Sequence, residues 1–141
     1  MTDKQRFFLL PINDRRRVAS LVVAICAVQI VQFLFSPSDR LISRWGGIAL
    51  NVLAAYWGVR PQRAPEFWFA WFPYLWFIPA IFEGREVFRA VELGTVTPMT
   101  LLNGVNLMLL LLLALPLLRF YRLSTSPKPK DSPSEMDPAS R

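Results

Sequence analysis

Three glutamates lie close together in one short charged stretch, Glu83, Glu86 and Glu92. Paired carboxylates can act as general acid and base, or hold a divalent cation through their oxygen atoms. Arg85 and Arg89 are interleaved with these acids, and opposite charges on neighbouring turns of a helix neutralise one another. The pattern therefore favours a short, solvated helix at a membrane surface over a catalytic or metal-binding cluster.

The sequence lacks the residues on which most other site chemistry depends. It has no histidine, which excludes imidazole-ligated haem, histidine-containing zinc and di-iron sites, and Ser-His or Cys-His nucleophiles. Cys26 is the only cysteine, so no disulfide can form within one chain. No Walker lysine motif, G-x-G-x-x-G, G-x-S-x-G or metal-binding cysteine pair occurs. We therefore expect no catalytic residues, metal, haem or zinc, and a protein that is not an enzyme.

Besides Asn51 in the second apolar stretch, four amide side chains interrupt the first and last ones, where uncompensated polarity costs free energy in hydrocarbon. Gln29 and Gln32 lie about one helical turn apart and share a face with Cys26. Asn103 and Asn106 have the same spacing in the last apolar stretch. Hydrogen bonds between helices are the expected role of all four. Binding of a polar ligand, or a pathway lined by these amides, is the alternative.

Small residues form a stripe along the second apolar stretch, at spacings of three and four. They are Gly47, Asn51, Ala54, Ala55 and Gly58. Such a stripe lets another helix approach closely. It predicts either packing within this chain or an interface with a second copy or another membrane protein.

The stretch from Phe67 to Phe82 is strongly aromatic, with nine of its 16 residues Phe, Trp or Tyr. Trp68, Trp71 and Trp76 exceed what an aromatic belt at the membrane surface needs. A flat aromatic wall can hold a quinone, carotenoid, sterol or chlorin ring by offset or edge-to-face packing. Alternatively, the rings fill space around two prolines without any ligand. These three tryptophans are the candidate cofactor-binding residues, and the sequence does not identify the cofactor.

The elements that carry these residues are predicted to be membrane helices. Apolar residues make up 53% of the 141 and fall in long blocks, which is typical of a membrane protein. We predict an all-α membrane protein, a bundle of four transmembrane helices in two antiparallel hairpins, with the third span kinked at Pro73 and Pro79. The expected spans cover residues 18–35, 41–59, 67–82 and 99–118. Because the third is short, a re-entrant or interfacial segment is its competitor.

The distribution of Lys and Arg predicts the orientation, since these residues gather on the cytoplasmic side. With four spans, 12 of the 16 lie before the first span, between the second and third, or after the fourth. We therefore expect a basic cytoplasmic N-terminal segment (1–17), a transmembrane domain (18–122) and a disordered cytoplasmic tail rich in Ser, Pro and Lys (123–141). If the third stretch did not cross, the basic C-terminal segment would violate the rule.

The net charge is +6, and the basic residues flank the apolar blocks. This arrangement suits anionic lipid headgroups and not nucleic acid. The leading hypothesis is a non-enzymatic accessory, assembly or stabilising subunit of a larger complex in a bacterial inner or plastid-like membrane, holding a lipid, quinone or pigment in one version. Its partners would be membrane lipids and other membrane proteins or a second copy.

Two alternatives come from other functional classes. The first is a small homo-oligomeric transporter or channel lined by Gln29, Gln32 and Asn51, although none of the predicted spans contains the acid that ion coupling usually requires. The second is a lipid- or isoprenoid-directed enzyme that uses the charged stretch at the interface.

Overall fold

The computed structural model describes residues 2–35 and 41–125, and all regular structure in these ranges is helical, which confirms the predicted all-α class. The elements in chain order are α1 (Asp3–Phe8), α2 (Ile12–Phe35), α3 (Leu41–Val59), the short 3₁₀ turn η1 (Pro61–Arg63), α4 (Glu66–Glu92) and α5 (Pro98–Thr125). Most of the predicted disordered tail, residues 126–141, lies outside the described residues.

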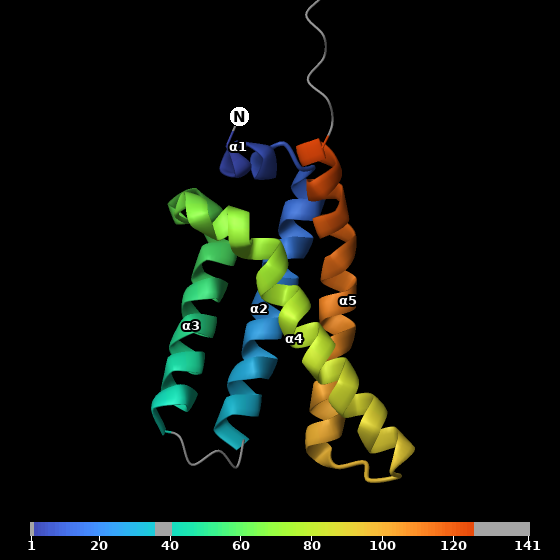
Figure 1. The fold of residues 1–141 in the computed structure, drawn as a ribbon. Coiled ribbons are helices and arrows are strands. Elements are labelled where there is room, and N and C mark those ends of the chain that lie inside the picture. The colour runs from blue at the N-terminus through green and yellow to red at the C-terminus, as the bar shows by residue number, and fades with distance from the viewer. Residues whose placement is uncertain (1, 36–40, 126–141) are drawn as a thin grey trace, which may run out of the picture.

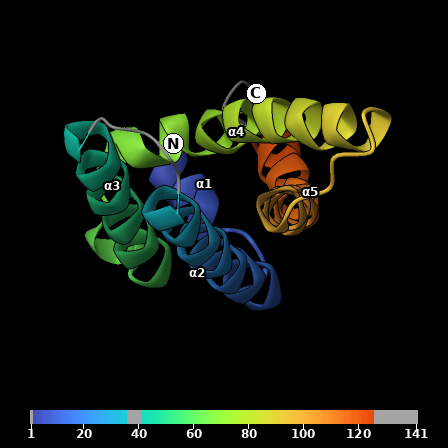
Figure 2. The ribbon, with the colours of Figure 1, turned by 90° about the horizontal axis from the view of Figure 1, so that it is seen from below.

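The four long helices form two antiparallel hairpins, α2 with α3 and α4 with α5 (Figure 1). The contact between α2 and α5 joins the hairpins, whereas α3 packs to no comparable extent against α4. In Figure 1, α4 crosses in front of α2 and α5 at an angle, and Figure 2 shows that it lies along one side of the bundle and extends beyond α5. As a result, α3 and α4 lie close at the upper end of Figure 1 and diverge towards the lower end.

Two of these helices, residues Ile12–Phe35 and Pro98–Arg122, are long and apolar enough to cross a membrane. In both, fewer than a third of the residues in the most apolar stretch are buried within the chain. Their remaining apolar side chains therefore face outward, as they do in helices surrounded by lipid. Among the described helices, α3 and α4 do not meet the same test, so the structure supports two of the four predicted spans by this measure.

The aromatic and charged stretches belong to one helix, α4, and not to two separate elements as the sequence suggested. Its 27 residues continue through Pro79 and through the junction between Phe82 and Glu83 without a break. At 1.5 Å per residue the helix is about 40 Å long. Glu83 therefore lies inside a long helix and not at the start of a short interfacial one.

The core is strongly aromatic at the upper end of Figure 1, where α1 lies across the long helices. The ring centroid of Phe7 lies 5.3 Å from that of Phe69 and 6.4 Å from those of Phe72 and Phe120. Edge-to-face and tilted packing of this kind stabilises aromatic clusters beyond simple burial. The N-terminal segment that the sequence predicted only as a basic flank therefore contributes to the core.

Hydrogen bonds hold α1 in place. A capping box between Thr2 and Gln5 starts the helix. The Lys4 Nζ then donates to the backbone carbonyls of Gln62 (2.8 Å) and Ala64 (3.1 Å), which lie in and after η1. The N-terminal helix is thereby tied to the connection between α3 and α4.

An ion pair between a buried aspartate and an exposed arginine closes the same end of the bundle. Arg119 Nη1 lies 2.7 Å from Asp14 Oδ2, and the Asp14 side chain is only 5% exposed. The pair joins the first turn of α2 to the last turns of α5. Both helices extend beyond the predicted spans, since α2 begins at Ile12 and α5 ends at Thr125. A carboxylate can be buried here because a charged hydrogen-bond donor lies directly opposite.

Two glycines allow α3 to lie close to α2. A Cβ atom on Gly58 would lie 2.9 Å from Val22 Cγ1, and one on Gly47 would lie 2.5 Å from the Phe33 ring. Gly46, beside Gly47 in the sequence, has nothing within 4 Å of the same position. The small-residue stripe therefore serves packing within this chain at both of its glycines.

We expect Gly58→Ala to lower the free energy of unfolding by about 1–3 kcal/mol, because Val22 is fully buried and β-branched and cannot move aside. Gly46→Ala is the matched control and should be neutral or stabilising by up to ~1 kcal/mol through helix propensity. Thermal unfolding in detergent, followed by circular dichroism, measures both. Equal effects of the two substitutions would contradict the close α2–α3 packing.

Candidate functional site

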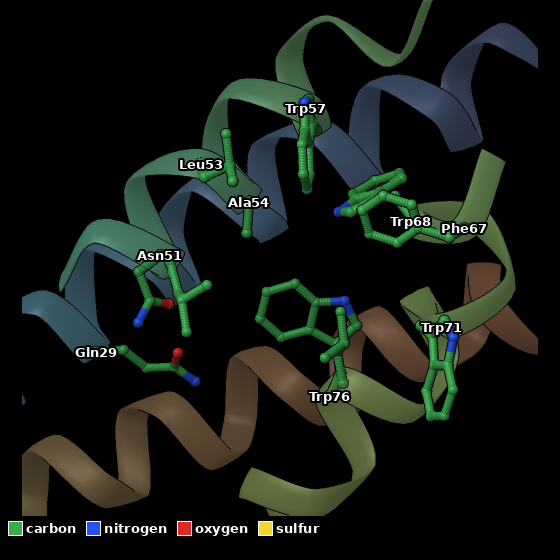
Figure 3. A pocket seen from close by; sticks show the side chains of 11 residues that line it. Gln29, Asn51, Leu53, Ala54, Trp57, Phe67, Trp68, Trp71 and Trp76 are labelled. Carbon is green, nitrogen blue, oxygen red and sulfur yellow. The ribbon is translucent and has the colours of Figure 1, made fainter. Parts of the chain in front are cut away.

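An aromatic cavity of about 440 Å³ lies between α3 and α4. Figure 3 shows it from close by, with Trp57 of α3 facing the aromatic side chains of α4. Its aromatic lining consists of Trp57, Phe67, Trp68, Trp71 and Trp76. The structure thus brings together all three tryptophans that the sequence marked as candidate cofactor-binding residues.

The spacing of residues along α4 explains how the aromatic rings reach the cavity. Trp68, Phe72 and Trp76 follow one another at intervals of four, so one helix face carries all three into the core. Packing between rings fixes Trp68, whose centroid lies 4.5 Å from that of Phe72 and 6.5 Å from that of Trp57. Trp71 lies off this face and is 62% exposed, so it contributes an outer wall only.

Two of these tryptophans carry buried polar atoms that no described residue pairs. Trp68 and Trp76 are 2% and 5% exposed, and their Nε1 atoms are buried without a hydrogen-bond partner in the described part of the chain. In Figure 3 both nitrogens lie on the ring edges that face the space between the two indoles. An indole N–H is only a donor, and leaving it buried and unpaired costs about 1–3 kcal/mol. Two unpaired donors therefore belong to side chains that line the cavity.

A second, polar cavity of about 420 Å³ continues from the first towards the end where α4 and α5 are connected. The two cavities share Gln29, Leu50 and Asn51 in their linings. The polar cavity is also lined by Gln32 and Glu83. Together they form one groove between α3 and α4, aromatic at one end and polar at the other.

Four side chains from three helices form a polar network beside this second cavity. Gln32 Nε2 of α2 donates to Asn103 Oδ1 of α5 (2.8 Å) and to Glu83 Oε1 of α4 (3.4 Å). Asn106 Nδ2 of α5 donates to the same Glu83 oxygen at 2.5 Å. Asn106 is fully buried. Three of the four amides singled out in the sequence thus hydrogen-bond between helices, and Glu83 is the acceptor that joins two of them.

The fourth amide, Gln29, takes a different position. It lies with Asn51 at the junction of the two cavities, and both line each cavity. Asn51 Nδ2 donates to the Gly47 carbonyl within its own helix (2.9 Å), so the stripe turns this one polar member towards the groove. Ala54 and Ala55, the remaining members, pack against the core.

Glu83 is the site residue whose role the sequence analysis missed. It was grouped with Glu86 and Glu92, but both of those are exposed and neither joins the polar network. The available signal was the lack of any turn-forming residue between Phe82 and Glu83, which allows α4 to continue and places the acid beside α2 and α5. The acid whose absence argued against ion coupling is thus present inside the bundle.

No family model, curated protein or solved structure matches this chain.

We expect Asn106→Leu to lower the free energy of unfolding by about 1.5–3 kcal/mol, because it removes a hydrogen bond to a half-buried carboxylate. Glu83→Leu should also be destabilising. The double variant should lose less than the sum of the two, since no polar partner is then left unpaired. Chemical unfolding of all three variants measures this coupling, with Asn13→Leu at an exposed position as the control. Strictly additive effects would contradict the network.

Proposed function

We propose that this chain is a four-span integral membrane protein that holds one lipophilic ring compound with a hydrogen-bond acceptor, such as a quinone, in the aromatic cavity. We further propose that it acts as a non-enzymatic subunit of a larger membrane complex. The observation that carries the ligand proposal is the pair of buried, unpaired indole N–H groups of Trp68 and Trp76.

The chemistry of the cavity favours this class of ligand. Its volume falls within the roughly 300–1,000 Å³ of ordinary small-molecule sites. Its aromatic walls suit a flat ring, and its two free donors call for an acceptor such as a carbonyl oxygen. A transmembrane helix from a partner would not satisfy these donors through its backbone, because its carbonyls are already paired within the helix. Since the sequence has no histidine, a metal-free ring is the simpler occupant.

The arrangement of the helices supports four crossings. The 19 residues of α3 and the 27 of α4 give lengths of about 28 and 40 Å, close to or above the ~30 Å hydrocarbon core. Both lie beside helices that are apolar enough to span. Lys4, Arg60, Arg63 and Arg119 gather at one end of the bundle, which favours a cytoplasmic location for both termini.

The outer face of α4 supports the subunit role. Trp71, Phe77, Phe82 and Phe88 are all exposed and extend along most of the helix. Aromatic side chains are enriched where membrane and protein partners meet, and a continuous apolar face of this kind gives a neighbouring protein a surface to pack on. The alternative of a lipid-directed enzyme loses its motivation, because Glu83 faces the bundle and Glu86 does not.

Cysteine labelling tests whether α4 crosses the membrane. In a Cys26→Ala background, Gln62→Cys and Thr95→Cys place exposed thiols at the two ends of α4. A membrane-impermeant maleimide should label Thr95→Cys in intact cells and Gln62→Cys only after permeabilisation. Cys26→Ala alone should remain unlabelled. Labelling of both positions from the same side would show that α4 does not cross.

Quenching of tryptophan fluorescence by a short-chain benzoquinone tests the ligand site. The purified protein should show saturable quenching, and Trp76→Phe or Trp68→Phe should weaken the affinity about fivefold, since each removes one hydrogen bond worth ~1 kcal/mol. Trp45→Phe is the control, because Trp45 lies outside both cavities and is exposed. Unchanged affinity in Trp68→Phe and Trp76→Phe would contradict the proposed site.

Native mass spectrometry of the detergent-extracted protein tests the subunit role separately from the ligand site. After mild-detergent extraction of the tagged protein, native mass spectrometry should find a larger assembly with a defined partner. Free protein or a homo-oligomer alone would contradict the subunit role and leave the ligand proposal intact.

A further inference from the structure

The polar network contains a second set of unpaired buried atoms, and these are acceptors. Glu83 Oε1 accepts hydrogen bonds from Asn106 and Gln32, but Glu83 Oε2 is buried without a partner. The same holds for Asn106 Oδ1, in a residue that is fully buried. These two oxygens belong to side chains that are hydrogen-bonded to each other. The two unpaired acceptors therefore come from adjacent side chains of α4 and α5.

The charge of this network is also uncompensated. No ion pair among the described residues includes Glu83, and the arginines that follow it on α4, Arg85 and Arg89, are exposed. Neutral amides stabilise a carboxylate by hydrogen bonding but do not cancel its charge. A buried charge without a counter-charge is strongly unfavourable. Either a proton on Glu83 or a bound cation would supply the compensating positive charge, and only a cation would make stability depend on the salt present.

The number of carboxylates in the network determines which charge a bound cation would need. Only one carboxylate is present in the network, and the described residues contain no group of three or more Asp, Glu, Cys or His side chains that could hold a metal ion. A divalent ion would leave an excess positive charge in an apolar environment, and it normally requires more carboxylates. A monovalent cation neutralises Glu83 and can be surrounded by amide and carboxylate oxygens.

A route for such an ion leads from the membrane face opposite the basic end. A third cavity of about 380 Å³ lies beside the connection between α4 and α5 and is lined by Glu86, Thr97 and Thr100. It shares Met99 and Asn103 with the polar cavity, whose lining includes Glu83. Hydroxyl and carboxylate oxygens therefore line the approach from the connecting loop to the half-buried acid, together with the guanidinium of Arg89.

We infer that Glu83 and Asn106 bind one monovalent cation, an alkali metal ion or an ammonium group, between α4 and α5. The carboxylate supplies the charge and the Asn106 carbonyl supplies a second oxygen. Gln32 donates to the carboxylate and to Asn103, and Gln32 and Asn103 line the polar cavity. This site is separate from the aromatic cavity and does not depend on any ligand there.

Cation-dependent thermal stability of the full-length protein tests the inference. The detergent-solubilised protein is exchanged into choline chloride, and NaCl, KCl or NH₄Cl then replaces choline at constant pH and ionic strength. A bound cation should raise the melting temperature and the rise should saturate, because only the folded state has the site. Stabilisation by Na⁺ or K⁺ identifies an alkali ion, and stabilisation by NH₄⁺ alone identifies an ammonium group.

Matched variants make the result specific to Glu83. Glu83→Gln keeps the size and an acceptor oxygen but removes the charge, so it should fold in choline and lose the cation effect. Glu92→Gln, at an exposed acid farther along α4 that lines none of the three cavities, should keep it. Trp76→Phe should also keep it, which separates this site from the proposed ring ligand. No dependence on any monovalent cation, a response to CaCl₂ alone, or an equal response in Glu83→Gln would overturn the inference.

Discussion

The contact between α2 and α5 holds the two hairpins together, and the form of the groove depends on it. Asp14 and Arg119 close this contact at one end with an ion pair whose carboxylate is buried, and Gln32 hydrogen-bonds to Asn103 near the other end. Between them the two helices contribute fully buried residues such as Val22 and Leu113. Each of the outer helices, α3 and α4, then packs mainly on its own hairpin partner. Since α3 and α4 do not pack closely against each other, a groove lined by α2 remains between them.

The unpaired donors lie at one end of this groove and the unpaired acceptors lie at the other. At the aromatic end, the unpaired groups are the donors of Trp68 and Trp76, and at the polar end they are the acceptors of Glu83 and Asn106. A simple hydrocarbon chain would match neither end of this pattern, because it has neither donors nor acceptors. An acceptor-bearing ring at one end and a cation at the other match both, because each supplies what its end lacks.

The sequence was sufficient for features that depend on local pattern. The apolar block at 41–59 predicted α3 with the bounds that the structure gives it, and the interval of four along the aromatic stretch brought Trp68 and Trp76 to one face. It was insufficient where a partner lies far away in the chain. Asp14 can be buried at the start of α2 because Arg119, 105 positions later, donates a hydrogen bond to its carboxylate and balances its charge. Glu83 was assigned to solvent because its donors, Gln32 and Asn106, come from two other helices.

The position of the two ends on α4 determines how they can act together. Glu83 follows Trp76 by seven residues, two turns, so both lie on nearly the same face and are separated by about 10 Å along the helix axis. A single small ring beside Trp76 is too short to reach the carboxylate, so ring and cation must be separate occupants. Each nevertheless needs the same face of α4 turned towards α2. Any influence of one site on the other must therefore act through the position of this helix or through the charge of Glu83, and not through direct contact between the ligands.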